Sequence, residues 1–92
     1  MESIHIEAHW VAAEKRMVVR LYIGGQNFLE TFTRARWRWF VAGLDRDPLR
    51  IAGLTIKFRG DAERSARMAN GIRRYLRRVD AAFRATGATT HI

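Results

Sequence analysis

The stretch SARMANGIRRYLRRVDAAF, residues 65–83, decides the fold class, because its apolar side chains recur at the spacing of one helical face. The stripe begins after Gly60 and Asp61, which is a candidate helix cap, and continues to about residue 85. Its members are Ser65, Met68, Ile72, Tyr75, Leu76, Val79 and Phe83. We therefore predict a long amphipathic helix at the carboxyl end of the chain, with this face buried.

Apolar and polar residues alternate near the amino end, and they predict the β-sheet that this helix would cover. Residues 4–10 and 17–23 place an apolar side chain at every second position, which is the period of a half-buried strand. The polar residues 12–16 between them are typical of a hairpin loop. Gly24-Gly25 is a strong turn signal and leads into a weaker strand over residues 28–32. We expect an antiparallel meander.

The stretch TRARWRWF, residues 33–40, fits two conformations. Trp37 and the apolar residues up to Leu44 have helical spacing, whereas the alternation of arginines with apolar residues over 34–41 also fits a strand. We predict a helix, because Thr33 can cap its start and Gly43 falls near its end. The helix sends Trp37 into the core and Trp39 to another face, whereas a strand would bury both tryptophans on one face.

The remaining segments complete a single-domain prediction for residues 1–92. DRDP, residues 45–48, is typical of a turn, and residues 54–58 alternate as a fourth strand. Residues 87–92 are expected to form a loose tail. The predicted fold class is α+β: a small antiparallel sheet of three to four strands, covered by a long C-terminal amphipathic helix and one shorter helix. The predicted order is β-β-β-α-β-α.

The charge and composition of the chain indicate which classes of partner it can bind. The 92 residues carry a formal net charge of +8, and of the 17 basic residues only Lys15 and Lys57 are lysine, so 15 are arginine. Such a chain attracts phosphate polymers, and arginine suits bidentate phosphate or carboxylate contacts. There is no cysteine, no signal-peptide pattern and no apolar run near the roughly 18 residues that span a bilayer. We expect a cytoplasmic protein with no integral membrane segment.

Arginines on the final helix are the first candidate binding surface. At about 100° per residue, one side of this helix gathers Arg64, Arg67, Arg74 and Arg78 around Gly71. The other flank holds Arg73, Arg77 and Arg84. A row of arginines around a bare glycine suits the close approach of a phosphate backbone. A solvated face with internal pairs is the plain alternative, since the helix offers Glu63 to Arg67 and Asp80 to Arg84 at i, i+4 spacing.

TRARWRWF supplies the second candidate surface. Arg34, Arg36 and Arg38 are candidate phosphate contacts, and Trp39 is a candidate for stacking on an unpaired base. Arginine and tryptophan also dominate hot spots between proteins, so the same residues suit a protein partner.

The sequence offers little support for metal binding, catalysis or binding to a membrane surface. His5 and His9 lie roughly 13 Å apart on a strand, too far to share one ion, although His5 and Glu7 are close enough to do so. No nucleophile elbow or phosphate loop is present. The predicted helix needs its apolar stripe to cover the sheet, which leaves none for a lipid surface. We expect no enzyme activity, no cofactor and no metal.

Two functions remain as hypotheses. The first is a small non-catalytic nucleic-acid-binding protein that contacts phosphates through its arginines. The second is a protein-interaction module or inhibitor that docks on an acidic or nucleic-acid-binding surface of a partner protein. A phage or mobile-element inhibitor of the anti-CRISPR type would have this size and charge, a comparison that rests on size and charge alone. Exposed sheet edges also allow a homodimer.

Overall fold

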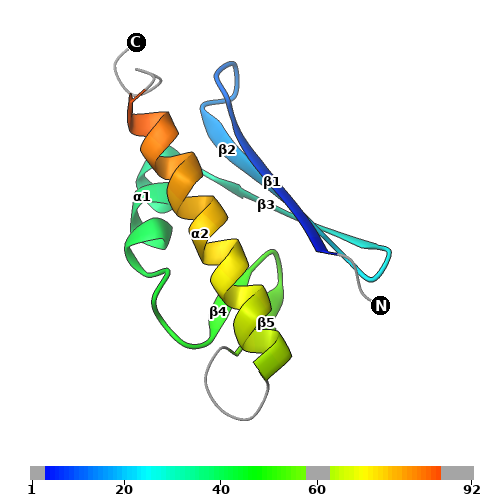
Figure 1. The fold of residues 1–92 in the computed structure, drawn as a ribbon. Helices are drawn as coiled ribbons and strands as arrows, with labels where there is room; N and C mark the ends of the chain where they lie inside the picture. Colours follow the sequence, from blue (N-terminus) through cyan, green and yellow to red (C-terminus); the bar gives the residue numbers. More distant parts are fainter. Residues whose placement is uncertain (1–3, 58–62, 86–92) are drawn as a thin grey trace.

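An antiparallel meander organises the molecule. The computed structural model describes residues 4–57 and 63–85, apart from the side chain of Arg64. Strands β1 (Ile4–Val11), β2 (Arg16–Ile23) and β3 (Gln26–Phe32) form one sheet in the order β1-β2-β3. Helix α2 (Glu63–Ala85) lies across one face of this sheet (Figure 1). The predicted meander and its covering helix are both confirmed.

The register of the sheet explains which face is buried. Val19 on the central strand pairs with Ala8 on one side and Glu30 on the other. Because side chains alternate across a strand, Met17, Val19 and Leu21 share that face, and all three are buried. The opposite face of β2 presents Arg16 and Arg20, both exposed. Gly24 and Gly25 close the hairpin between β2 and β3 with φ values of 56° and 79°, which suit glycine.

Residues 34–42 form a helix, as predicted. The side chain of Thr33 accepts a hydrogen bond from the Arg36 amide at 3.2 Å, and the Gly43 amide donates to the Phe40 carbonyl at 3.0 Å. These caps bound α1 (Arg34–Ala42). Trp37 is 1% exposed and packs edge-on against Phe32.

The region after α1 differs from the prediction of one fourth strand over residues 54–58. Leu54–Ile56 forms β5, which pairs with β4 (Leu49–Ile51) in a separate two-stranded sheet, so the order is β-β-β-α-β-β-α. Phe58 lies outside the described residues. Three residues are too few to show an alternation, and the turn between the strands, Ala52-Gly53, is a weaker signal than two glycines. The predicted turn at residues 45–48 is confirmed.

Contacts from β3 and α2 complete the core. The Glu30 carboxylate accepts a hydrogen bond from the Ala52 amide at 2.6 Å, which ties the small hairpin to the main sheet. The Tyr75 hydroxyl accepts from the Ala8 amide at 2.9 Å, which ties α2 to β1. The buried face of α2 consists of Ala69, Ile72, Leu76, Asp80 and Phe83, flanked by half-buried Met68, Tyr75 and Val79.

Three predictions made near the ends of α2 are not tested. The candidate cap Asp61 and the tail at residues 87–92 lie outside the described residues. The side chain of Arg64 is likewise outside the described part, so its place on the arginine surface stays a prediction.

Within the described part of the chain, no helix is long and apolar enough to cross a membrane.

Candidate nucleic-acid interface

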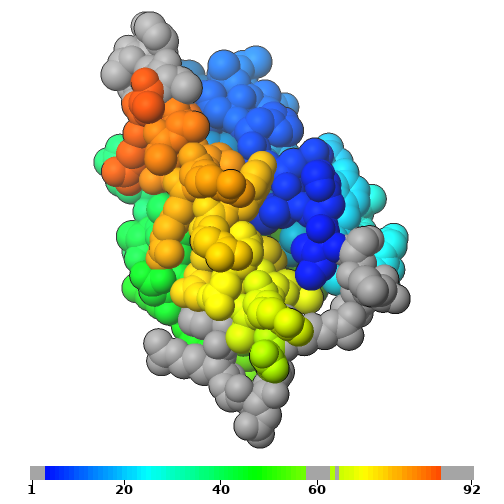
Figure 2. Space-filling view, in the orientation of Figure 1, coloured from blue at the N-terminus to red at the C-terminus, as the bar shows by residue number. Residues whose placement is uncertain are grey.

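The outer face of α2, which we define as Arg67, Gly71, Arg74 and Arg78, points away from the sheet. Its three arginine side chains are exposed, and within the described part of the chain none of them forms an ion pair. At 1.5 Å per residue, Arg67 and Arg78 lie about 16 Å apart along the helix. Figure 2 shows α2, in yellow to orange, running across the middle of the face in view.

Gly71 leaves the middle of this surface bare. A Cβ added to Gly71 would meet no atom of the protein within 4 Å. Glycine inside a helix costs about 1 kcal/mol relative to alanine, and packing gives no reason for it here. Because Gly71 has no side chain, the helix backbone is uncovered between Arg67 and Arg74, where the hypothesis of phosphate binding needs a close approach.

The side of α2 that faces α1 has the opposite character, because each of its three arginines meets a carboxylate. Arg73 Nη1 lies 3.2 Å from Asp45 Oδ1, and Arg77 Nη2 donates to the same oxygen. Arg73 also donates to Asn70 Oδ1. The hydrogen bond and charge of Arg77, with a smaller contribution from Arg73, hold the pKa of Asp45 below its usual range. We call Arg73, Arg77 and Arg84 the paired side of α2.

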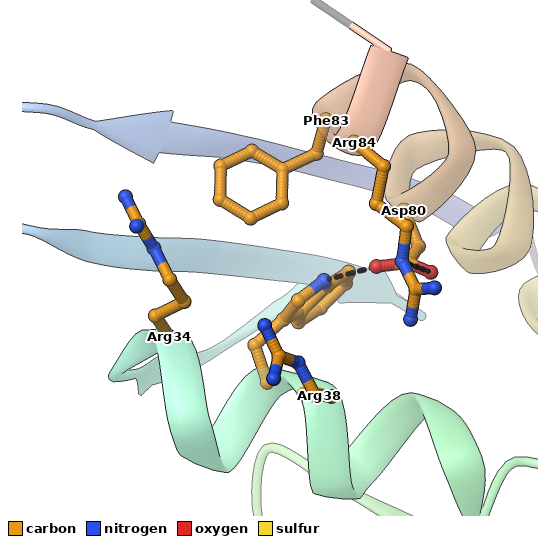
Figure 3. Close-up of a pocket in the computed structure, with 6 residues that line it drawn as sticks. Arg34, Arg38, Asp80, Phe83 and Arg84 are labelled. Atoms are coloured by element: carbon orange, nitrogen blue, oxygen red, sulfur yellow. Dashed lines mark hydrogen bonds and ion pairs between the residues drawn. The ribbon is translucent and has the colours of Figure 1, made fainter. Parts of the chain in front are cut away.

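Arg84 and the buried Asp80 join α2 to α1 (Figure 3). Trp37 Nε1 donates to Asp80 Oδ1 at 2.9 Å, and Arg84 Nε lies 3.1 Å from Asp80 Oδ2. Asp80 is only 8% exposed, and these two partners satisfy its two carboxylate oxygens. The pocket beside them, also bordered by Arg34 and Arg38, has room for about one water molecule. Within it, the bond from Trp37 to Asp80 links the two helices.

The three arginines of TRARWRWF point in different directions. The Arg34 guanidinium lies 5.2 Å from the centre of the Trp10 ring and is half-buried. The Arg36 side chain turns to β3, 3.6 Å from Glu30. Arg38 is exposed beside α2 and has no ion pair among the described residues. Of the three, Arg38 is the one best placed to contact an outside ligand.

Trp39 belongs to a separate surface. It is 70% exposed, and the Arg46 guanidinium lies 5.4 Å from its ring centre. Trp37 points toward α2, and a residue two positions further on is rotated by about 200° around the helix axis, so Trp39 points away from α2. A single short ligand therefore does not contact both Trp39 and the outer face of α2.

The other candidates remain apart from this site. His5 Nε2 lies 3.6 Å from Glu7 Oε2 on the exposed face of β1. Within residues 4–57 and 63–85 there is no cluster of three or more histidines or carboxylates that could hold a metal ion.

Sequence reasoning assigned Arg73 and Arg77 to a separate flank but missed their partner. Asp45 lies 28 residues before Arg73, and spacing rules detect only pairs within one helix or strand. The predicted pair of Asp80 with Arg84 is confirmed, whereas the bond from Trp37 had no local signal. No protein-family model, no curated protein and no solved structure matches the chain.

Proposed function

We propose that the protein binds nucleic acid without catalysing a reaction, and that the outer face of α2 contacts the phosphate backbone. The observation that carries the proposal is the row of three exposed arginines, Arg67, Arg74 and Arg78, without ion pairs in the described part of the chain. Each guanidinium keeps its donors free for a phosphate, where it forms short, charge-assisted hydrogen bonds.

The charges around these three arginines also favour nucleic acid as the ligand. The only acidic residues of α2 are Glu63, in its first turn, and Asp80, which is buried against Trp37. Arg38 extends the exposed positive charge onto the neighbouring helix. A polyanion that approaches the outer face of α2 meets opposing charge at its edges, from Glu63 and from the exposed Asp45 beside Arg77, while the overall charge of +8 speeds the encounter.

The surface suits backbone contact rather than base reading. The outer face of α2 carries no aromatic side chain for stacking and no asparagine or glutamine for reading adenine, and its arginines contact phosphates and, among the bases, guanine. Contacts to phosphates fix position and contribute affinity, but they carry no sequence information. The proposal is therefore binding that depends chiefly on the phosphate backbone.

The experiment is fluorescence anisotropy with labelled duplex DNA, single-stranded DNA and RNA at about 50 and 200 mM salt. Affinity is expected to fall steeply with salt, with a slope near 0.9 per phosphate contact. The test variant is Arg74→Ala with Arg78→Ala, and the matched control is Arg16→Ala with Arg20→Ala. Both pairs remove two exposed arginines, but the control pair lies on the opposite face of the sheet. Equal losses in the two variants would contradict a site on α2.

A second candidate function is docking on an acidic protein, and the exposed Trp39 favours it. An exposed tryptophan whose ring centre lies 5.4 Å from the Arg46 guanidinium has the composition of a hot spot between proteins. A pull-down from lysate with and without nuclease distinguishes the two. A protein captured after nuclease treatment and lost with Trp39→Ala would support docking, whereas dependence on Arg74 and Arg78 alone would support nucleic acid.

A further inference from the structure

Asp45 occupies a position between two guanidinium groups on the paired side of α2. One of its oxygens, Oδ1, accepts from both Arg73 and Arg77. The carboxylate is at the surface, because 76% of the Asp45 side chain is exposed. The arginines are less exposed, at 17% for Arg73 and 46% for Arg77. An anionic oxygen between two arginines is also the arrangement by which arginines hold a phosphate.

This carboxylate is not what holds its turn in place. The turn that carries Asp45 is held by its backbone, since the Leu44 amide donates to the Val41 carbonyl at 3.2 Å and the Arg46 amide donates to the Gly43 carbonyl at 3.0 Å. Leu44 anchors the turn in the core at 1% exposure. The Asp45 side chain can therefore leave the arginines while the turn remains in place.

The two arginines would stay positioned after Asp45 leaves. Arg73 retains its hydrogen bond to Asn70, and most of its side chain is buried. Arg77 lies three residues from Arg74, and residues with that spacing are neighbours on a helix surface. A phosphate backbone on the outer face of α2 thus has Arg77 and Arg73 beside it.

We propose that Arg73 and Arg77 form a phosphate-binding site that the Asp45 carboxylate fills in the free protein and vacates when a nucleic-acid phosphate takes its place. This inference rests on the proposed function. It adds two residues to the binding surface and makes Asp45 an internal competitor of the ligand. The free protein then binds more weakly than its arginines allow, because each binding event breaks the contacts to Asp45.

The test compares Asp45→Asn with Glu14→Gln, using anisotropy of a short labelled DNA duplex. Both substitutions remove one exposed carboxylate and raise the net charge by one, but Glu14 lies in the hairpin loop between β1 and β2. We expect Asp45→Asn to tighten binding by about two- to fivefold beyond Glu14→Gln, the range that an exposed ion pair contributes. Thermal melting of both variants checks that the fold is kept.

A second pair of variants makes the assignment specific. In a background that carries both Arg73→Ala and Arg77→Ala, Asp45→Asn should give no more than the gain of Glu14→Gln, because both competed arginines are gone. A gain that persists without the two arginines, or equal affinities of Asp45→Asn and Glu14→Gln in the wild-type background, would overturn the site. If those affinities are equal while Arg74→Ala with Arg78→Ala still weakens binding, only this site fails. Absence of salt-dependent binding by every variant would overturn the proposed function itself.

Discussion

The two sides of α2 show how neighbouring arginines in one sequence acquire different roles. Arg73 and Arg74 are adjacent, as are Arg77 and Arg78, yet the first of each pair binds Asp45 and the second is open to solvent. A rotation of about 100° per residue accounts for the difference, since it turns one arginine toward the segment after α1 and the next one outward.

The comparison teaches that net charge overstates the charge available to a ligand. On the paired side, the positive charges are partly neutralised by Asp45 and Asp80, and Asp80 also links α2 to Trp37 of α1. On the outer face, the arginines have no ion pair among the described residues and contribute nothing visible to packing. Substitutions on the two sides should therefore separate stability from binding.

The largest expected effect follows from removing Asp80 on the paired side. Asp80→Ala leaves the Trp37 indole N–H without its buried partner and should lower the free energy of unfolding by about 2 kcal/mol. Alanine favours a helix, so this net loss understates the value of the contacts. Urea unfolding followed by tryptophan fluorescence measures it. A midpoint equal to that of Glu14→Ala, which removes an exposed carboxylate, would refute the structural role of Asp80.

A smaller effect is expected from the adjacent pair of arginines. Arg73→Ala removes a largely buried side chain that contacts Asp45 and Asn70 and should cost about 1 kcal/mol. Arg74→Ala should change stability by less than about 0.5 kcal/mol, because Arg74 is exposed. Parallel urea titrations compare the two. Equal losses would show that the two sides of α2 do not differ as described.

Gly71→Ala should act in opposite directions on stability and binding. The added methyl group meets no protein atom, so the free energy of unfolding should rise by about 0.5–1 kcal/mol. If a phosphate approaches the bare backbone, the same methyl group should weaken DNA binding. Thermal melting and anisotropy measure the two quantities on one sample. A stabilised variant with unchanged affinity would remove Gly71 from the proposed interface.

The smallest effect is the pH dependence of Asp45. The pKa of Asp45 is lower in the folded protein than its ordinary value of 3.8, so its contribution to stability is present above about pH 4. That contribution is lost as the pH falls through the folded pKa, when the carboxylate takes up a proton. Melting temperatures of the wild type and Asp45→Asn should therefore converge in acid. A difference that widens below pH 4 has the wrong sign for this ion pair.

The sequence predicted elements whose signals are local. The apolar stripe of α2 and the alternation in β1 and β2 arise within single elements, and the caps at Thr33 and Gly43 identified α1 as a helix. Strand β4, which was not predicted, has only three residues, too few to show an alternation of apolar and polar side chains. Asp45 meets Arg73 and Arg77, and Asp80 meets Trp37, across 28 to 43 residues of sequence, so no spacing rule could identify those three contacts.

The hydrogen bond between Tyr75 and Ala8 affects how this protein behaves when it is concentrated. Strand β1 is an outer strand of the sheet, and outward-facing amides on such strands recruit strands from other chains into aggregates. The Tyr75 hydroxyl occupies one of these amides in the middle of β1, where α2 crosses the strand. The helix that carries the arginines thus also covers part of one sheet edge, where a Tyr75→Phe substitution would leave the Ala8 amide without this partner.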